Sequence, residues 1–138
     1  MTRFDHIMLT AANAAQARGY EAQLRWRRQC GLLDPATRVH VVPDPGGRRV
    51  GSLGATLQAL YRLALELAPR DCARRGSLAD LFAGQRILLC HSGGDSRRTP
   101  AYAAQGKVFT PLPTALHGQR VALFDLLVLL PKRIDLPL

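Results

Sequence analysis

Short apolar runs alternate with longer amphipathic stretches along this chain. The apolar runs predict β-strands at 6–10, 38–42 and 86–91. Between them, apolar residues recur every three or four positions, which predicts helices over 14–30 and 57–67 and a short helix over 78–83. This order of elements indicates an α/β fold, with a Rossmann-like, mostly parallel sheet flanked by helices.

Spacing within the first helix predicts which side chains face the core. Ala17, Tyr20 and Leu24 lie on one face of a helix of this length. Asn13 is placed to act as the N-cap, and Gly31 stands where a helix often ends.

The other elements have less distinctive patterns. The second helix has an apolar stripe formed by Leu57, Leu60, Ala64 and Leu67. The third strand is apolar throughout, so we expect it to be buried on both faces. Residues 121–130 are apolar enough for either a strand or a helix, and we predict a helix.

Composition and charge narrow the class of protein. A chain of 138 residues is expected to form one domain, and its net charge of +9 attracts polyanions such as nucleic acid, nucleotides or sugar phosphates. No segment approaches the roughly 18 apolar residues of a membrane span, so no membrane partner is expected. Three cysteines without a C-x-x-C pair favour a reducing cytoplasm over a disulfide framework or a zinc site.

The segment after the third strand carries the most informative chemistry. It reads His91-Ser92-Gly93-Gly94-Asp95-Ser96-Arg97-Arg98-Thr99-Pro100 and continues to Gly106-Lys107. The paired glycines allow backbone N–H groups to approach an anion, and Ser96 adds a hydroxyl donor. Arg97 and Arg98 can hold phosphate oxygens in a fork, and Lys107 adds a compact charge. These groups suit a triphosphate whose α-phosphorus is attacked.

Two other interpretations stay open on residue type alone. The glycines could form an ordinary surface turn with solvated arginines. Alternatively, basic clusters at 25–28, 48–49, 74–75 and 97–98 could belong to an arginine-rich nucleic-acid-binding module without catalysis. An aromatic content of only 6% argues against this module, and the cluster at 25–28 also suits the negative end of the first helix's dipole.

Two motifs, in this order, resemble those of the L-fucose-1-phosphate guanylyltransferases, also called GDP-fucose pyrophosphorylases. This family includes the pyrophosphorylase half of bifunctional enzymes that also carry an L-fucokinase. The first motif is Asp44-Pro45-Gly46-Gly47-Arg48-Arg49-Val50-Gly51-Ser52-Leu53-Gly54-Ala55-Thr56-Leu57. The second runs from His91-Ser92-Gly93-Gly94 through Arg98-x-Pro100 to Gly106-Lys107-Val108-Phe109-Thr110-x-Leu112-Pro113.

The resemblance implies a nucleotidyltransferase-like domain that converts GTP and L-fucose 1-phosphate into GDP-L-fucose and pyrophosphate with Mg²⁺. It implies that Arg98 and Lys107 are the catalytic residues that grip the triphosphate. The other nucleotide-binding positions that it implies are Gly93, Gly94, Ser96, Gly51, Ser52, Gly54 and Thr56. Arg97 falls at a variable position of the family pattern and is assigned to nucleotide binding as a supporting charge. Leu53 stands where the family has a glycine, so the first motif departs from the pattern there.

Chain length is the main departure from this family, whose members are several times longer. We therefore expect residues 1–138 to form the N-terminal portion of the nucleotidyltransferase domain, completed by a missing downstream domain and inactive alone as a fragment. The later carboxylates that would hold Mg²⁺ have no counterpart here, and Asp44 and Asp95 fit turns better than metal ligands.

The histidines carry weaker signals. His91 precedes the glycine-rich segment and could hydrogen-bond a phosphate. Because it ends an apolar strand, it is expected instead to be a packing residue that caps a backbone carbonyl. His6, His40 and His117 are scattered without metal-ligand spacing, so no metal site is assigned to them.

Overall fold

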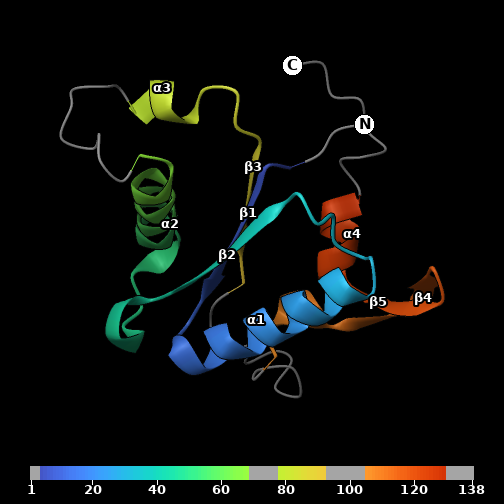
Figure 1. Ribbon diagram of the computed structural model, residues 1–138. Helices are drawn as coiled ribbons and strands as arrows, with labels where there is room; N and C mark the ends of the chain where they lie inside the picture. Colours follow the sequence, from blue (N-terminus) through green and yellow to red (C-terminus); the bar gives the residue numbers. More distant parts are fainter. Residues whose placement is uncertain (1–3, 69–77, 93–104, 130–138) are drawn as a thin grey trace.

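The computed structural model describes residues 4–68, 78–92 and 105–129 of the chain. Up to residue 91, its helices and strands follow the predicted order (Figure 1). They are β1 (His6–Ala11), α1 (Ala14–Gln29), β2 (Arg38–Pro43), α2 (Gly51–Leu67), α3 (Leu78–Phe82), β3 (Ile87–His91), β4 (Pro111–Leu116), β5 (Gln119–Ala122) and α4 (Leu123–Leu129), with short 3₁₀ turns η1 (Pro45–Gly47) and η3 (Lys107–Phe109).

The main sheet has three parallel strands in the order β2-β1-β3. All six residues of β1 are buried, because this strand has neighbours on both sides and helices over both faces. The predicted α/β fold with a parallel sheet is thereby confirmed. The prediction that the third strand is buried on both faces is wrong, since β3 forms one edge and its residues are half-buried or exposed.

Helices cover the two faces of the sheet, with α2 on one side and α1 and α4 on the other (Figure 1). The side chains of β1 divide between these layers. Ile7, Leu9 and Ala11 pack with α1 and α4, whereas Met8 packs with Ala59 and Leu63 of α2. This alternation follows from the two-residue period of a strand.

The predicted first helix is confirmed in detail. Asn13 caps α1 by accepting a hydrogen bond from the Gln16 backbone N–H at 2.9 Å. Ala17, Tyr20 and Leu24 are buried along one face. The chain leaves the helix through Gly31, whose φ of +71° belongs to the left-handed region.

The second helix begins earlier than predicted, and its buried face matches the predicted stripe only in part, at Ala64 and Leu67. Its buried residues are Ala55, Ala59, Leu63 and Ala64. Leu57, which the predicted stripe placed in the core, is 61% exposed. Small residues at 55 and 59 let the helix approach the sheet closely, and this selects their face over the bulkier one that contains Leu57.

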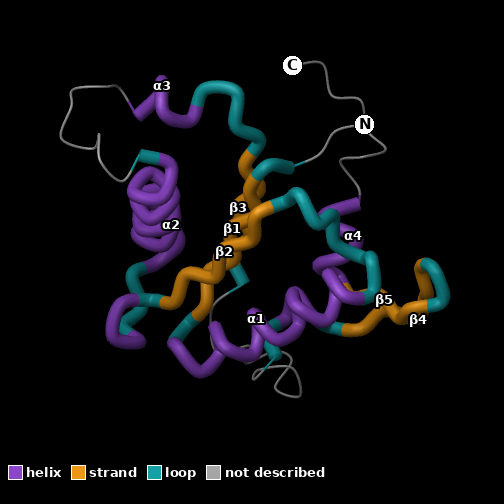
Figure 2. Tube along the Cα trace, viewed as in Figure 1, coloured by secondary structure: helices purple, strands orange, loops and turns teal. Residues whose placement is uncertain are grey.

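The end of the described chain is a hairpin followed by a helix, shown in strand and helix colours in Figure 2. β4 and β5 pair antiparallel through a turn in which His117 and Gly118 both have positive φ. The sequence pattern did not predict this hairpin. The predicted helix over 121–130 is corrected at its start, because Val121 and Ala122 belong to β5 and α4 begins at Leu123. Within the described ranges, no helix is long and apolar enough to cross a membrane.

Candidate functional site

A pocket of about 250 Å³ lies at the carboxyl ends of the three parallel strands. Each strand contributes to it: Thr10 from β1, Asp44 directly after β2, and His91 at the end of β3. Arg49, Gly51, Ser52 and Ala55 complete the lining. Ligands of open parallel sheets bind at this edge because the loops that follow the strands converge there.

The N-terminus of α2 forms one wall of the pocket. Val50 occupies the N-cap position and makes no side-chain hydrogen bond to the first turn. Gly51 has a φ of +72°, a conformation in which a larger residue would be strained. The first-turn amides and the positive end of the helix dipole therefore face a pocket that also holds Arg49, an arrangement that suits an anion.

His91 occupies a different position from the one predicted. Its ring is exposed at the pocket instead of capping a backbone carbonyl, and Nε2 lies 3.0 Å from Thr56 Oγ1. The Thr56 hydroxyl donates its single hydrogen to the Ser52 carbonyl at 2.9 Å, so it can only accept from the imidazole. The tautomer with hydrogen on Nε2 follows, and within the described ranges Nδ1 has no hydrogen-bond partner.

The first predicted motif is thus partly at the pocket. Gly51 and Ser52 line it, and Thr56 reaches it through His91. Gly54 is not among the lining residues. A Cβ at Gly54 would lie 2.9 Å from the Val50 Cβ, so this glycine is explained by helix packing.

The second predicted motif is described only at its ends. Gly93, Gly94, Ser96, Arg97 and Arg98 lie outside the described residues. Lys107 is exposed at the start of η3 and does not line the pocket. The buried Gly106 precedes it.

Arginines of the 25–28 cluster serve the fold. Arg27 is buried and forms a bidentate pair with Asp125, at 2.8 and 3.2 Å. Arg28 donates to the Thr37 carbonyl at 2.8 Å.

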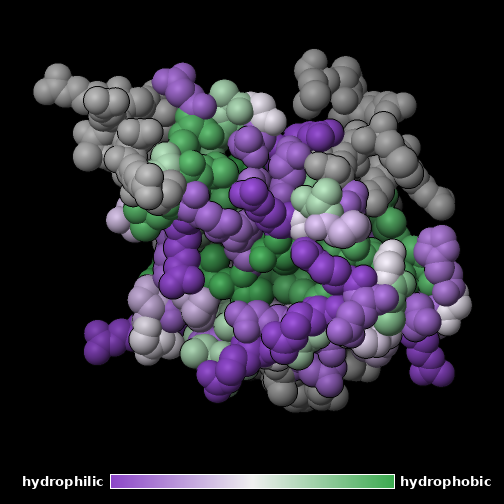
Figure 3. All heavy atoms as spheres, viewed as in Figure 1, coloured by the Kyte–Doolittle hydropathy of each residue, from purple (hydrophilic) through white to green (hydrophobic). Residues whose placement is uncertain are grey.

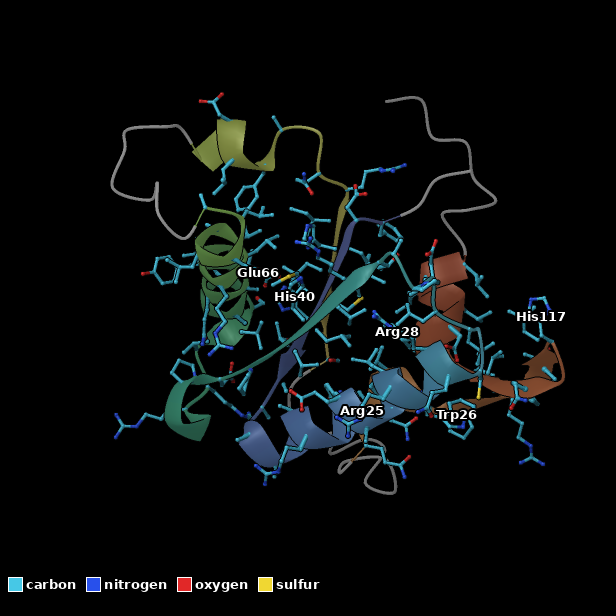
Figure 4. All side chains as sticks on the ribbon, in the orientation of Figure 1. Arg25, Trp26, Arg28, His40, Glu66 and His117 are labelled. Atoms are coloured by element: carbon cyan, nitrogen blue, oxygen red, sulfur yellow. The ribbon has the colours of Figure 1, made fainter. Side chains whose placement is uncertain are left out.

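A second hollow of about 300 Å³ lies beside α1. Its lining residues are Leu24, Leu33, Val39, Val41, Glu21, Arg25 and Arg28. Figure 3 shows hydrophobic side chains in this hollow, and Figure 4 shows Arg25 and Arg28 projecting from α1.

Thr10, Arg49 and His91 line this pocket together, although the sequence motifs assigned none of them individually to a binding site. Each stands at or soon after the end of a predicted strand, or just before a helix. That position was a usable signal because parallel strands bring their carboxyl ends to one edge.

The described residues do not form a metal site of their own. No group of three His, Cys, Asp or Glu side chains within 4–68, 78–92 and 105–129 is arranged to hold an ion. Among the described residues, Asp44 is the carboxylate that lines the pocket.

The fold and the pocket together indicate the class of protein: an α/β protein whose pocket, at the carboxyl ends of parallel strands, suits an anion. Comparison with known proteins identifies the particular family. Residues 79–135 match the family model of the fucose pyrophosphorylase domain. The resemblance seen in the sequence is confirmed over this region of the chain.

Curated relatives extend the match beyond this region. A bifunctional fucokinase/GDP-fucose pyrophosphorylase of Arabidopsis thaliana is 40% identical over 119 residues, which are 80% of this chain and 11% of the relative. Fucose-1-phosphate guanylyltransferases of Mus musculus and Homo sapiens are each 36% identical over 110 residues, covering 80% of this chain. The chain spans only 17% and 16% of these two relatives. No solved structure shows a significant match to the chain.

Proposed function

We propose that this chain carries the GTP-binding part of a fucose-1-phosphate guanylyltransferase. The observation that carries this proposal is the pocket at the carboxyl ends of β1, β2 and β3. Residues of the first family motif (Arg49, Gly51 and Ser52) and the first residue of the second (His91) meet there, although they are distant in sequence. Such convergence is unexpected for two unrelated surface turns.

The described groups suit a phosphate chain. The first amides of α2 and the Ser52 hydroxyl can donate to phosphate oxygens, and Arg49 supplies positive charge beside them. His91 adds a ring nitrogen whose orientation Thr56 fixes. In the proposed reaction, an oxygen of L-fucose 1-phosphate attacks the α-phosphorus of GTP. The bond from that phosphorus to the β-phosphate oxygen breaks, and pyrophosphate leaves with its electron pair.

Arg98 and Lys107 are proposed to neutralise the charge that develops on the phosphates, with Gly93, Gly94, Ser96 and Arg97 in the same segment. Phosphoryl and nucleotidyl transfer depends mainly on such positioning and charge neutralisation. Mg²⁺ is proposed only as an ion that arrives on the triphosphate, since the described residues supply no metal site.

Calorimetric titration of the chain with GTP and Mg²⁺ tests the proposal. Lys107→Ala and Arg98→Ala are each expected to weaken binding by about 1–3 kcal/mol, because a charge-assisted contact is lost. Arg120→Ala is the matched control, since Arg120 is an exposed cation on β5 outside the pocket. Equal affinity of both variants and the wild type would refute the assignment.

The same titration separates nucleotide binding from the nucleic-acid alternative. A nucleotide site should prefer GTP over other triphosphates. A nucleic-acid-binding module should instead bind single- or double-stranded DNA without base preference, and this binding should weaken steeply with salt. Pyrophosphate release in the presence of L-fucose 1-phosphate separates turnover from binding alone.

A further inference from the structure

Tyr20 connects two parts of the chain that are distant in sequence. It projects from α1 into the core, is fully buried, and packs edge-on against Phe109 at a centroid distance of 5.3 Å. Its hydroxyl donates a hydrogen bond of 2.9 Å to the Ser92 carbonyl. Burial raises the pKa of this hydroxyl, so the group keeps its hydrogen and remains a donor.

The same ring also holds Gly106. A Cβ at this position would lie 2.5 Å from two carbons of the Tyr20 ring, which is closer than real Cβ contacts. Gly106 has a φ of +75° as well, so a side chain here is excluded by both space and backbone conformation. The main chain at Gly106 therefore lies directly on the tyrosine.

These contacts lie at the two described ends of the second motif. Ser92 directly follows β3, and its hydroxyl donates to the Thr10 carbonyl at 2.8 Å, which ties it to the central strand. Gly106 directly precedes Lys107, and its carbonyl accepts from the Phe109 backbone N–H at 3.1 Å within η3. Tyr20 is the side chain that contacts both points.

We propose that Tyr20 is a positioning residue that fixes the chain at Ser92 and Gly106 and thereby sets the place of Lys107 relative to the pocket. The proposal rests on the proposed function for the role of Lys107, but its geometric part stands independently. Tyr20 itself is buried and is not among the residues that line the pocket, so it acts through the backbone.

Tyr20→Phe tests the proposal because it removes only the hydroxyl and leaves the ring over Gly106. We expect GTP affinity to fall about three- to tenfold while circular dichroism shows a folded chain. Tyr61→Phe is the matched control, since Tyr61 is 64% exposed on α2.

A double-mutant cycle separates positioning from general destabilisation. If Tyr20 places Lys107, Lys107→Ala should weaken GTP binding less in the Tyr20→Phe background than in the wild type. Equal effects of Lys107→Ala in the two backgrounds would overturn the proposal.

Amide hydrogen exchange gives a readout that does not depend on nucleotide. In Tyr20→Phe, the amides of Phe109 and Thr110, which donate to the Gly106 and Lys107 carbonyls, should exchange faster relative to those of β1. Unchanged exchange of these two amides would contradict the positioning role of Tyr20. If the wild type does not bind GTP but exchange increases as expected, the proposed function fails and the positioning of Lys107 by Tyr20 stands.

Discussion

Arg27 is a cation within a basic cluster, yet its side chain is only 3% exposed. Asp125 accepts from it in bidentate geometry, and Gln23 Oε1 accepts from Nη1 at 2.7 Å. The Asp125 carboxylate also accepts from the Ala122 backbone N–H at the start of α4. The pair therefore joins α1 to α4, while the guanidinium lies 4.7 Å from the Phe109 ring centroid.

Removing one partner of this pair should lower the free energy of unfolding, because the other charge would stay buried without an opposite charge beside it. Arg27→Gln is expected to lower the free energy of unfolding by about 3–5 kcal/mol in urea titrations. Arg25→Gln, on the exposed side of the same helix, should change it by less than about 0.5 kcal/mol. A similar small effect for both variants would show that the pair does not hold α1 and α4 together.

At the scale of single elements, α2 shows that helical spacing alone does not decide which face of a helix is buried. The stripe that begins at Leu57 and the one that begins at Ala55 both have helical spacing, so the sequence alone permits either face. Packing against Met8 and Val42 of the sheet selects the face with Ala59 and Leu63. The exposed side retains Leu53 and Leu57, at 72% and 61%.

A pair of leucine variants tests this choice of face. Leu63→Ala should lower the free energy of unfolding by about 2–5 kcal/mol, because it leaves a cavity beside the sheet. Leu57→Ala removes the same atoms from an exposed position and should cost less than about 0.5 kcal/mol. Thermal or urea unfolding measures both variants. A larger loss of unfolding free energy for Leu57→Ala than for Leu63→Ala would support the predicted stripe that places Leu57 in the core.

At the scale of the whole molecule, a chain of polar contacts links the sheet to the α2 layer. His6 Nδ1 lies 3.1 Å from His40 Nε2, and His40 Nδ1 lies 3.1 Å from Glu66 Oε2. Figure 4 shows His40 and Glu66 facing one another from β2 and α2. A neutral His40 satisfies both contacts, donating to Glu66 and accepting from His6.

This arrangement predicts a pH-dependent stability. Burial lowers the pKa of His40; Glu66 opposes this, and His6 and Arg38 add to it. The unfolded chain then binds a proton more readily than the folded one, so stability is highest above about pH 6.5 and decreases as the pH falls through that value. Arg62 lines the same hollow as His40 and Glu66.

Urea unfolding at about pH 7.5 and 5.5 measures the effect, and His40→Asn should reduce the difference between the two. His117→Asn is the control, because His117 is exposed in the β4–β5 turn and Asn tolerates its positive φ. The interpretation is wrong if His40→Asn retains the wild-type pH dependence.

Local patterns along the sequence sufficed for much of this protein. The strands, the helix that begins after Asn13, the parallel α/β class and the family resemblance all depend on neighbouring residues, whose spacing and turn chemistry the chain itself displays. Gly51 and Ser52, which the first motif assigns to nucleotide binding, line the pocket, and their binding role stays a prediction.

Tertiary structure decided everything that depends on which elements become neighbours. It made β1 the central strand and β3 an edge, chose the buried face of α2, and formed the β4–β5 hairpin. It also buried Arg27 against Asp125 and brought His91 to Thr56. Such contacts join residues far apart in sequence, and their free energy depends on burial and mutual orientation that no local window of residues contains.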